Sequence, residues 1–111
     1  MSTLSLAALA VRKEDYQKIE SKVAQANPDI NMVIDNKFVV LSWRWRKLYM
    51  NNGFNDLIKT VDCKNIPFSY IEYDEYGNLE TKESTYECED LEEFFSLEMN
   101  IKINHYDLNV V

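Results

Sequence analysis

The pattern of apolar residues changes near the start of the chain, and the change separates two expected elements, a strand and a helix. Residues 3–11 are mostly apolar over a short run, which predicts a first β-strand. Residues 14–26 show the period of an amphipathic helix. Glu14 and Lys18 are expected to pair on its exposed side, and Pro28 is expected to end it. The apolar positions of this helix are Tyr16, Ile19, Val23 and Ala26.

A β-hairpin is predicted next, with strands at residues 31–34 and 38–45. Asp35 and Asn36 lie between them, and both residue types tolerate the positive φ of a tight hairpin turn. The second strand begins with four consecutive apolar residues, so its start is expected in the interior of the sheet. The rest of this strand alternates. One face carries Trp43 and Trp45, and the other carries Ser42, Arg44 and Arg46.

A second helix is expected after the turn Asn51-Asn52-Gly53, because apolar residues again recur at helical spacing. Pro67 precedes a strand at residues 68–73. Residues 75–78 are then expected to form a hairpin tip, with residues 79–88 as the returning strand. The apolar positions of the second helix are Phe54, Leu57, Ile58 and Val61.

The last third of the chain predicts one more helix and one more strand. Asp90 with Glu93 resembles a capping box that begins a short helix. Residues 99–103 alternate between apolar and polar positions, which indicates a half-buried strand. The elements together predict one α+β domain over residues 1–111. Its sheet is expected to be mixed or antiparallel, with about five to six strands, and two longer helices and one short helix packed mainly on one face.

Composition agrees with a folded domain, and charge adds the strongest functional indication. Apolar residues make up 46% of the chain, which argues against disorder although the net charge is −7. The charge is unevenly distributed. Residues 72–98 hold eleven carboxylates and one base, Lys82, whereas residues 1–69 hold seven acids and ten bases. An unmixed field of this kind commonly attracts a cationic partner.

Tyrosines interleave with these acids, and tyrosine is frequent among the residues that anchor protein interfaces. Ten net charges also correspond to the charge of about 17 Å of duplex DNA, at one charge per roughly 1.7 Å. The segment could therefore imitate a nucleic-acid backbone toward a basic groove. A solvated acidic face that keeps the protein soluble is the alternative. The expected partner-binding residues are Glu72, Asp74, Glu75, Tyr76, Glu80, Glu83, Glu87, Glu89, Asp90, Glu92 and Glu93.

Catalytic and cofactor motifs are not found in the sequence, so we do not expect an enzyme, a metal site or a cofactor. His105 is the single histidine, and with two glycines no phosphate-binding loop can be built. A small enzyme or ligand-binding domain that uses Cys88 and His105 is kept as an alternative. Loss of function in a His105→Ala variant would favour it.

The sequence allows only general expectations about cellular location and self-association. The apolar N-terminal run is short and lacks a preceding base, so a strand is favoured over a signal peptide. No apolar stretch is long enough for a membrane span, and we expect a cytoplasmic protein. The thiols of Cys63 and Cys88 are expected to be reduced, but the sequence leaves their pairing open. The basic cluster at Arg44–Lys47 would also permit a head-to-tail homodimer.

In size, acidity and lack of catalytic groups the chain resembles the small acidic proteins that phages use against host defences, such as anti-CRISPR and anti-restriction proteins. Those proteins share no common signature, so the resemblance assigns no role to any residue. It implies an inhibitor that occupies the basic nucleic-acid-binding groove of a larger protein, without binding nucleic acid itself. An immunity protein that neutralises a nuclease toxin has the same physics and stays open as an alternative.

Overall fold

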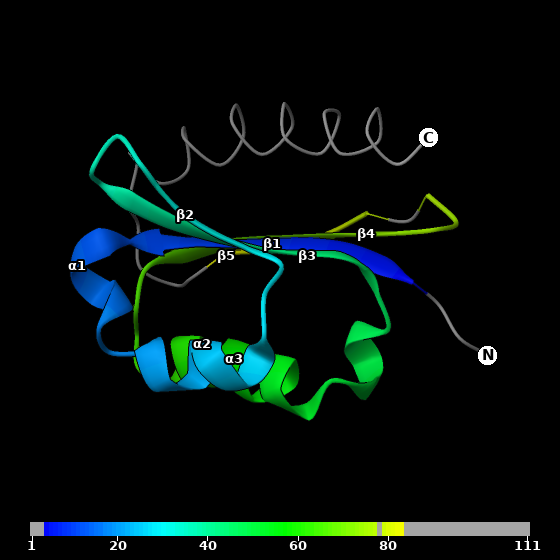
Figure 1. The fold of residues 1–111 in the computed structure, drawn as a ribbon, viewed down its shortest axis with the longest axis horizontal. Helices are drawn as coiled ribbons and strands as arrows, with labels where there is room; N and C mark the ends of the chain where they lie inside the picture. Colours follow the sequence, from blue (N-terminus) through cyan, green and yellow to red (C-terminus); the bar gives the residue numbers. More distant parts are fainter. Residues whose placement is uncertain (1–3, 78, 84–111) are drawn as a thin grey trace.

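The sheet is built outward from the first strand. In the computed structural model, which describes residues 4–77 and 79–83, β1 (Ser5–Arg12) pairs with β3 (Phe38–Arg46) on one side and β4 (Phe68–Asp74) on the other. Strand β2 (Ile30–Ile34) lies outside β3, and β5 (Leu79–Glu83) lies outside β4. All four pairings are antiparallel (Figure 1). The apolar run in β1 follows from its place at the centre of this sheet.

The helices α2 (Glu20–Ala26) and α3 (Asn52–Cys63) lie side by side against one face of the sheet (Figure 1). Two shorter elements accompany them, namely α1 (Lys13–Tyr16) after β1 and a 3₁₀ turn, η1 (Leu48–Met50), before α3. The predicted α+β class is thus confirmed, with an antiparallel sheet, two helices of seven residues or more and a short one. The short helix predicted at Asp90 is outside the described residues, as are the strand at residues 99–103 and residues 84–88 of the returning strand.

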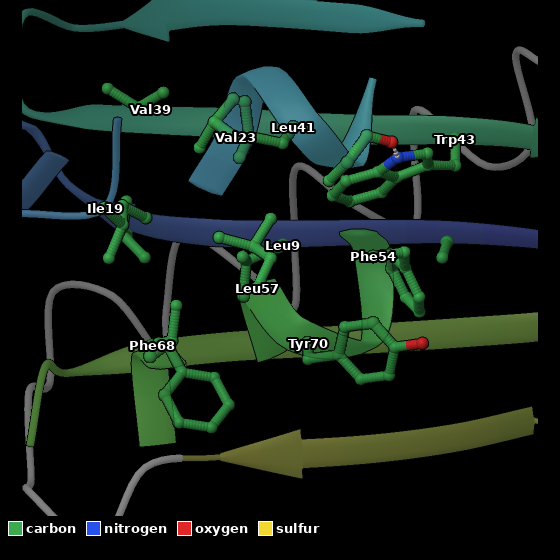
Figure 2. Packing of buried hydrophobic residues seen from close by; sticks show 14 of the residues in the cluster. Leu9, Ile19, Val23, Val39, Leu41, Trp43, Phe54, Leu57, Phe68 and Tyr70 are labelled. Carbon is green, nitrogen blue, oxygen red and sulfur yellow. Dashed lines mark hydrogen bonds between the residues drawn. The ribbon is translucent and has the colours of Figure 1, made fainter. Parts of the chain in front are cut away.

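The main core lies between the sheet and these two helices (Figure 2). The predicted apolar residues of both helices point into it, and Leu57, Val61 and Ile19 are fully buried. Phe54 packs edge-on against Trp43, with 4.8 Å between ring centroids. The Trp43 indole N–H donates to the carbonyl oxygen of Ala26 at 2.9 Å, which ties β3 to the end of α2.

The opposite face of the sheet is apolar as well. A second buried cluster there includes Ala8 and Ala10 of β1, Val40 of β3 and Ile71 of β4. The buried residues of α2 and α3 belong to the main core, on the helix side of the sheet. The sheet therefore buries apolar side chains on both of its faces, as the near-continuous apolar sequence of its central strands requires.

The helix predicted over residues 14–26 is interrupted. Helix α1 ends at Tyr16 and α2 begins at Glu20, with the backbone N–H of Ile19 donating to the carbonyl of Tyr16 between them. The expected pair of Glu14 with Lys18 is wrong. Lys18 instead contacts the buried carboxylate of Asp15 at 3.0 Å, and Glu14 contacts Arg12 at 3.0 Å. The end of α2 before Pro28 is confirmed, and Asn27 caps it with φ 51°.

The alternation predicted for the end of β3 is wrong, because a β-bulge interrupts it. Trp43 pairs with Ala7, but Arg46 pairs with Ser5, so two residues of β3 stand opposite the single residue between Ser5 and Ala7. Trp45 lies in this bulge with φ 48°. Arg46 consequently returns to the helix side, where its guanidinium donates to the carbonyl of Asn27.

The backbone conformations of the turns agree with the residue types found in them. Asp35 and Asn36 have φ of 53° and 55°, as the predicted hairpin turn requires, and Gly77 at the next hairpin tip has φ 86°. Gly53 serves a different purpose at the start of α3. A Cβ atom there would lie 2.1 Å from the carbonyl oxygen of Gln25 in α2, so only glycine allows this close approach of the two helices.

Candidate protein-binding surface

The described part of the acidic segment lies on the β4–β5 hairpin at one side of the sheet. Glu72 pairs in register with Ala7, and Tyr70 pairs with Leu9. Because Leu9 and Tyr70 belong to the core under the helices, Glu72 lies in the row of β4 positions on the helix side. Asp74 is two positions further and belongs to the same row. The hairpin therefore places Glu72 and Asp74 in one row.

Asp74 and Glu75 also have structural roles that the sequence does not reveal. The Asp74 carboxylate accepts the backbone N–H of Tyr76 at 2.9 Å and so stabilises the turn. The Glu75 carboxylate accepts the backbone N–H of Leu4 at 3.1 Å, while the Glu75 N–H donates to the Leu4 carbonyl. These contacts secure the start of the central strand. Tyr76, at the tip, is 67% exposed.

Strand β5 brings further acids to the same hairpin by its register. Glu80 is the Cα partner of Glu72, and Glu83 is the Cα partner of Ser69. Glu80 and Glu83 are three residues apart, so they occupy positions of opposite parity along the strand. Like charges at directly opposed positions destabilise an antiparallel pair. The register therefore places two residues of like formal charge, Glu72 and Glu80, at directly paired positions.

A groove beside Glu72 joins this acidic hairpin to the helical layer. It has a volume of about 520 Å³ and lies between η1, α3 and β4. Sequence reasoning missed it, because its lining comes from three separate segments. One lining residue, Tyr49, is a large side chain that the structure leaves 53% exposed. The residues of the groove that concern its chemistry are Tyr49, Phe54, Ile58, Lys59, Tyr70 and Glu72.

The acids of the remaining body are largely compensated by nearby bases. Asp15 contacts both Arg12 and Lys18, and Asp56 contacts Lys22 at 2.7 Å. Two residues of the basic cluster Arg44–Lys47 also make contacts within the body. Arg46 contacts the carboxylate of Asp29 at 3.7 Å, and the backbone N–H of Arg44 donates to the same carboxylate at 2.7 Å. This cluster therefore secures the end of β3 against the α2–β2 connection.

A second, open hollow of about 570 Å³ lies where β1 ends and the β2–β3 turn begins. Lys13 and Lys37 both line it, and the Lys13 ammonium donates to the side-chain oxygen of Asn36. Glu14 lines it too, and its carboxylate contacts Arg12. Positive and negative groups are thus mixed here, and the hollow has no single charge preference.

The other expected functional residues are outside the described part of the chain, as are Cys88 and His105 of the enzyme alternative. Cys63 is a free and exposed thiol at the end of α3. Among residues 4–77 and 79–83, no three His, Cys, Asp or Glu side chains are grouped as a metal site would need. The expected partner-binding residues outside that part are Glu87, Glu89, Asp90, Glu92 and Glu93.

None of the helices in the described ranges has the length and hydropathy that a bilayer-spanning helix needs.

Comparison with known proteins adds no relative. No protein-family model matches the chain, and neither the curated proteins nor the solved structures contain a match.

Proposed function

We propose that this chain is a small acidic inhibitor that binds a larger protein and covers its basic nucleic-acid-binding groove. The observation that carries the proposal is the segregation of charge. Residues 72–98 hold eleven carboxylates and a single base, while the rest of the chain has a small positive excess. Such a segment attracts a basic protein surface over a long range and repels nucleic acid itself.

The β4–β5 hairpin supports this proposal in two ways. Three of its acids lie close together by register, since Glu72 is two positions from Asp74 on β4 and is the Cα partner of Glu80. The body acids Asp15, Asp29 and Asp56 each contact a base of the body, and residues 1–69 carry a small positive excess. The hairpin and the segment after it therefore account for the net charge of the molecule, and we propose that they form the contact with the partner in the cytoplasm.

Electrostatic attraction sets the expected behaviour of the complex. Association is fast at low ionic strength and slows as salt screens the charges, with a Debye length of about 10 Å at 0.1 M. Tyr76, exposed at the hairpin tip, contributes apolar contact area that salt does not screen. Inhibition is therefore expected to weaken steeply between low and high salt without vanishing.

The test is a panel of purified DNA- and RNA-cleaving enzymes, comprising CRISPR effector nucleases, restriction endonucleases and nuclease toxins. Each is assayed for cleavage with and without the purified chain over a series of salt concentrations. Inhibition of a defence nuclease supports an anti-defence role, and inhibition of a toxin supports the immunity alternative. The variant Glu80→Lys/Glu83→Lys/Glu87→Lys is expected to lose most of the inhibition.

A second triple variant controls for the change in net charge. Glu14→Lys/Glu20→Lys/Asp62→Lys alters the charge by the same amount at exposed body positions and is expected to inhibit nearly as well as the parent. Full inhibition by the hairpin variant, with its fold verified by circular dichroism, would refute the proposal.

A further inference from the structure

The face of the sheet opposite α2 and α3 is buried, although these two helices do not cover it (Figure 1). Val40 is 1% exposed there, and Phe38 and Ile71 are each 6% exposed. Every described member of this second cluster belongs to a strand. Side chains on one face of a sheet stand beside one another, so none of them covers the outer ends of the others. Such complete burial therefore needs a further apolar segment packed over the strands.

The end of β5 brings the rest of the chain close to this face. Glu83, the last described residue, is the Cα partner of Ser69. The same row of paired residues continues through Ala10 to Val40, a member of the cluster. At about 4.8 Å between neighbouring strands, Glu83 and Val40 are roughly 14 Å apart across the sheet. Six residues of extended chain span about 20 Å, so residues 84–89 are long enough to bring the following segment over the cluster.

The segment that follows this connection lies outside the described part of the chain, but its sequence predicts a short helix with one apolar side. Leu91, Phe94 and Phe95 recur at spacings of three and four residues. With 3.6 residues per turn, these three side chains share one side of such a helix. Glu92 and Glu93 belong to the other side. The segment therefore has an apolar surface to bury and an acidic surface to leave in water.

The sizes of the side chains in the second cluster favour aromatic partners. The central strand β1 contributes the small residues Ala8 and Ala10, whereas its neighbours contribute the larger Val40 and Ile71. Protein cores are close-packed, and large side chains pack opposite small ones. A phenyl ring also buries a large apolar area. Two phenylalanines in one turn of helix therefore suit the space above the two alanines.

We propose that Leu91, Phe94 and Phe95 pack on the second cluster and shield it from water. The packed segment then carries Glu92 and Glu93 on its outer side. This packing does not require the inhibitory function, but it gives part of the acidic segment a fixed place on the body of the molecule. A second copy of the chain is the other apolar cover available, and the experiment separates the two.

The experiment measures nuclear Overhauser effects in the full-length chain, with ¹³C labels in the methyl groups of valine, leucine and isoleucine. The methyls of Val40 and Ile71 are expected to give cross-peaks to the rings of Phe94 and Phe95, because packed side chains approach within about 4.5 Å. Phe94→Leu and Phe95→Leu assign the rings, and each variant should lose one set of cross-peaks. The methyls of Leu57, in the core on the helix side, should give none to either ring.

Glu92→Gln/Glu93→Gln is the control variant, because it removes charge from the outer side of the segment and should leave these cross-peaks in place. Isotope-filtered spectra of mixed labelled and unlabelled protein distinguish contacts within one chain from contacts between copies. Cross-peaks between copies, or cross-peaks from the cluster to other residues in place of Phe94 and Phe95, overturn the proposal. The absence of cross-peaks to both rings overturns it as well. None of these results depends on nuclease inhibition, so the proposed function is decided separately by its cleavage assay.

Discussion

Gly53 and Gln25 meet at the crossing of α3 and α2, where a Cβ atom on Gly53 would stand 2.1 Å from the carbonyl oxygen of Gln25 and 3.1 Å from the backbone nitrogen of Ala26. Both contacts are with backbone, which cannot rotate away as a side chain can. The first turn of α3 is thus seated directly on the last turn of α2. This contact sets the distance between the two helices that cover the sheet.

Gly53→Ala is therefore expected to destabilise the fold by about 3 kcal/mol or more, because one of the two helices must shift. Urea unfolding followed by far-UV circular dichroism measures the change. Gly77→Ala is the comparison, since among the described residues a Cβ there meets only the Tyr73 hydroxyl at 3.8 Å, and the cost comes from φ 86°. That cost should be about 1 kcal/mol. Equal losses in the two variants would contradict the steric explanation.

Asp15→Asn tests the buried carboxylate at the start of the helical layer. Asp15 is 2% exposed and contacts Arg12 at 2.8 Å and Lys18 at 3.0 Å. Its two partners are partly exposed, so we expect a loss of only about 1–2 kcal/mol rather than the larger cost of a fully buried pair. Glu14→Gln removes a second, exposed carboxylate from the same Arg12 and should cost below about 0.5 kcal/mol. Thermal unfolding of both variants decides whether burial of the carboxylate, or only its proximity to Arg12, determines its contribution to stability.

Trp43→Phe removes the indole N–H that donates to the Ala26 carbonyl and leaves a small cavity beside Phe54. The expected loss is about 2 kcal/mol in the free energy of unfolding. Trp45→Phe is the natural control, because within the described chain the buried indole nitrogen of Trp45 has no hydrogen-bond partner. Its replacement should cost distinctly less in the same denaturant titration. A larger loss of unfolding free energy in Trp45→Phe than in Trp43→Phe would show that stability depends more on the tryptophan in the β-bulge than on the one that contacts α2.

Cys63 is free and exposed at the end of α3, so its thiol should react readily in the folded protein. A Cys88→Ser variant isolates it. In this variant one thiol is expected to react with Ellman's reagent at a rate close to that of the denatured chain. A strongly protected thiol would disagree with the exposed position of Cys63.

Local signals in the sequence were sufficient for most elements. The hairpin turn at Asp35 and Asn36 depends on residues that tolerate positive φ, and both indeed adopt it. Helix α3 was recognisable from the spacing of Phe54, Leu57 and Val61, all of which are buried. These predictions succeeded because the residues that determine each element lie within it.

The differences arose where side-chain and backbone details outside the hydrophobic pattern decide the local structure. The break between α1 and α2 accompanies the burial of Asp15 between Arg12 and Lys18, and the periodicity of the helix contains no sign of it. The bulge at Trp45 has positive φ without a glycine to announce it. The groove needs Tyr49 and Tyr70 from separate elements. The acidic segment was visible from its composition alone, but the residues that the fold places around it were not.

The position of β1 has a consequence for how the protein is made. The middle strand of the sheet, β1, comes before both of its neighbours, β3 and β4, along the chain and is therefore synthesised before them. One edge of this apolar strand must therefore stay unpaired until β4 has emerged. Sheets that depend on such non-local pairing fold slowly, on the order of milliseconds to seconds. Synthesis that stops before β4 is thus expected to leave an aggregation-prone fragment rather than a smaller folded one.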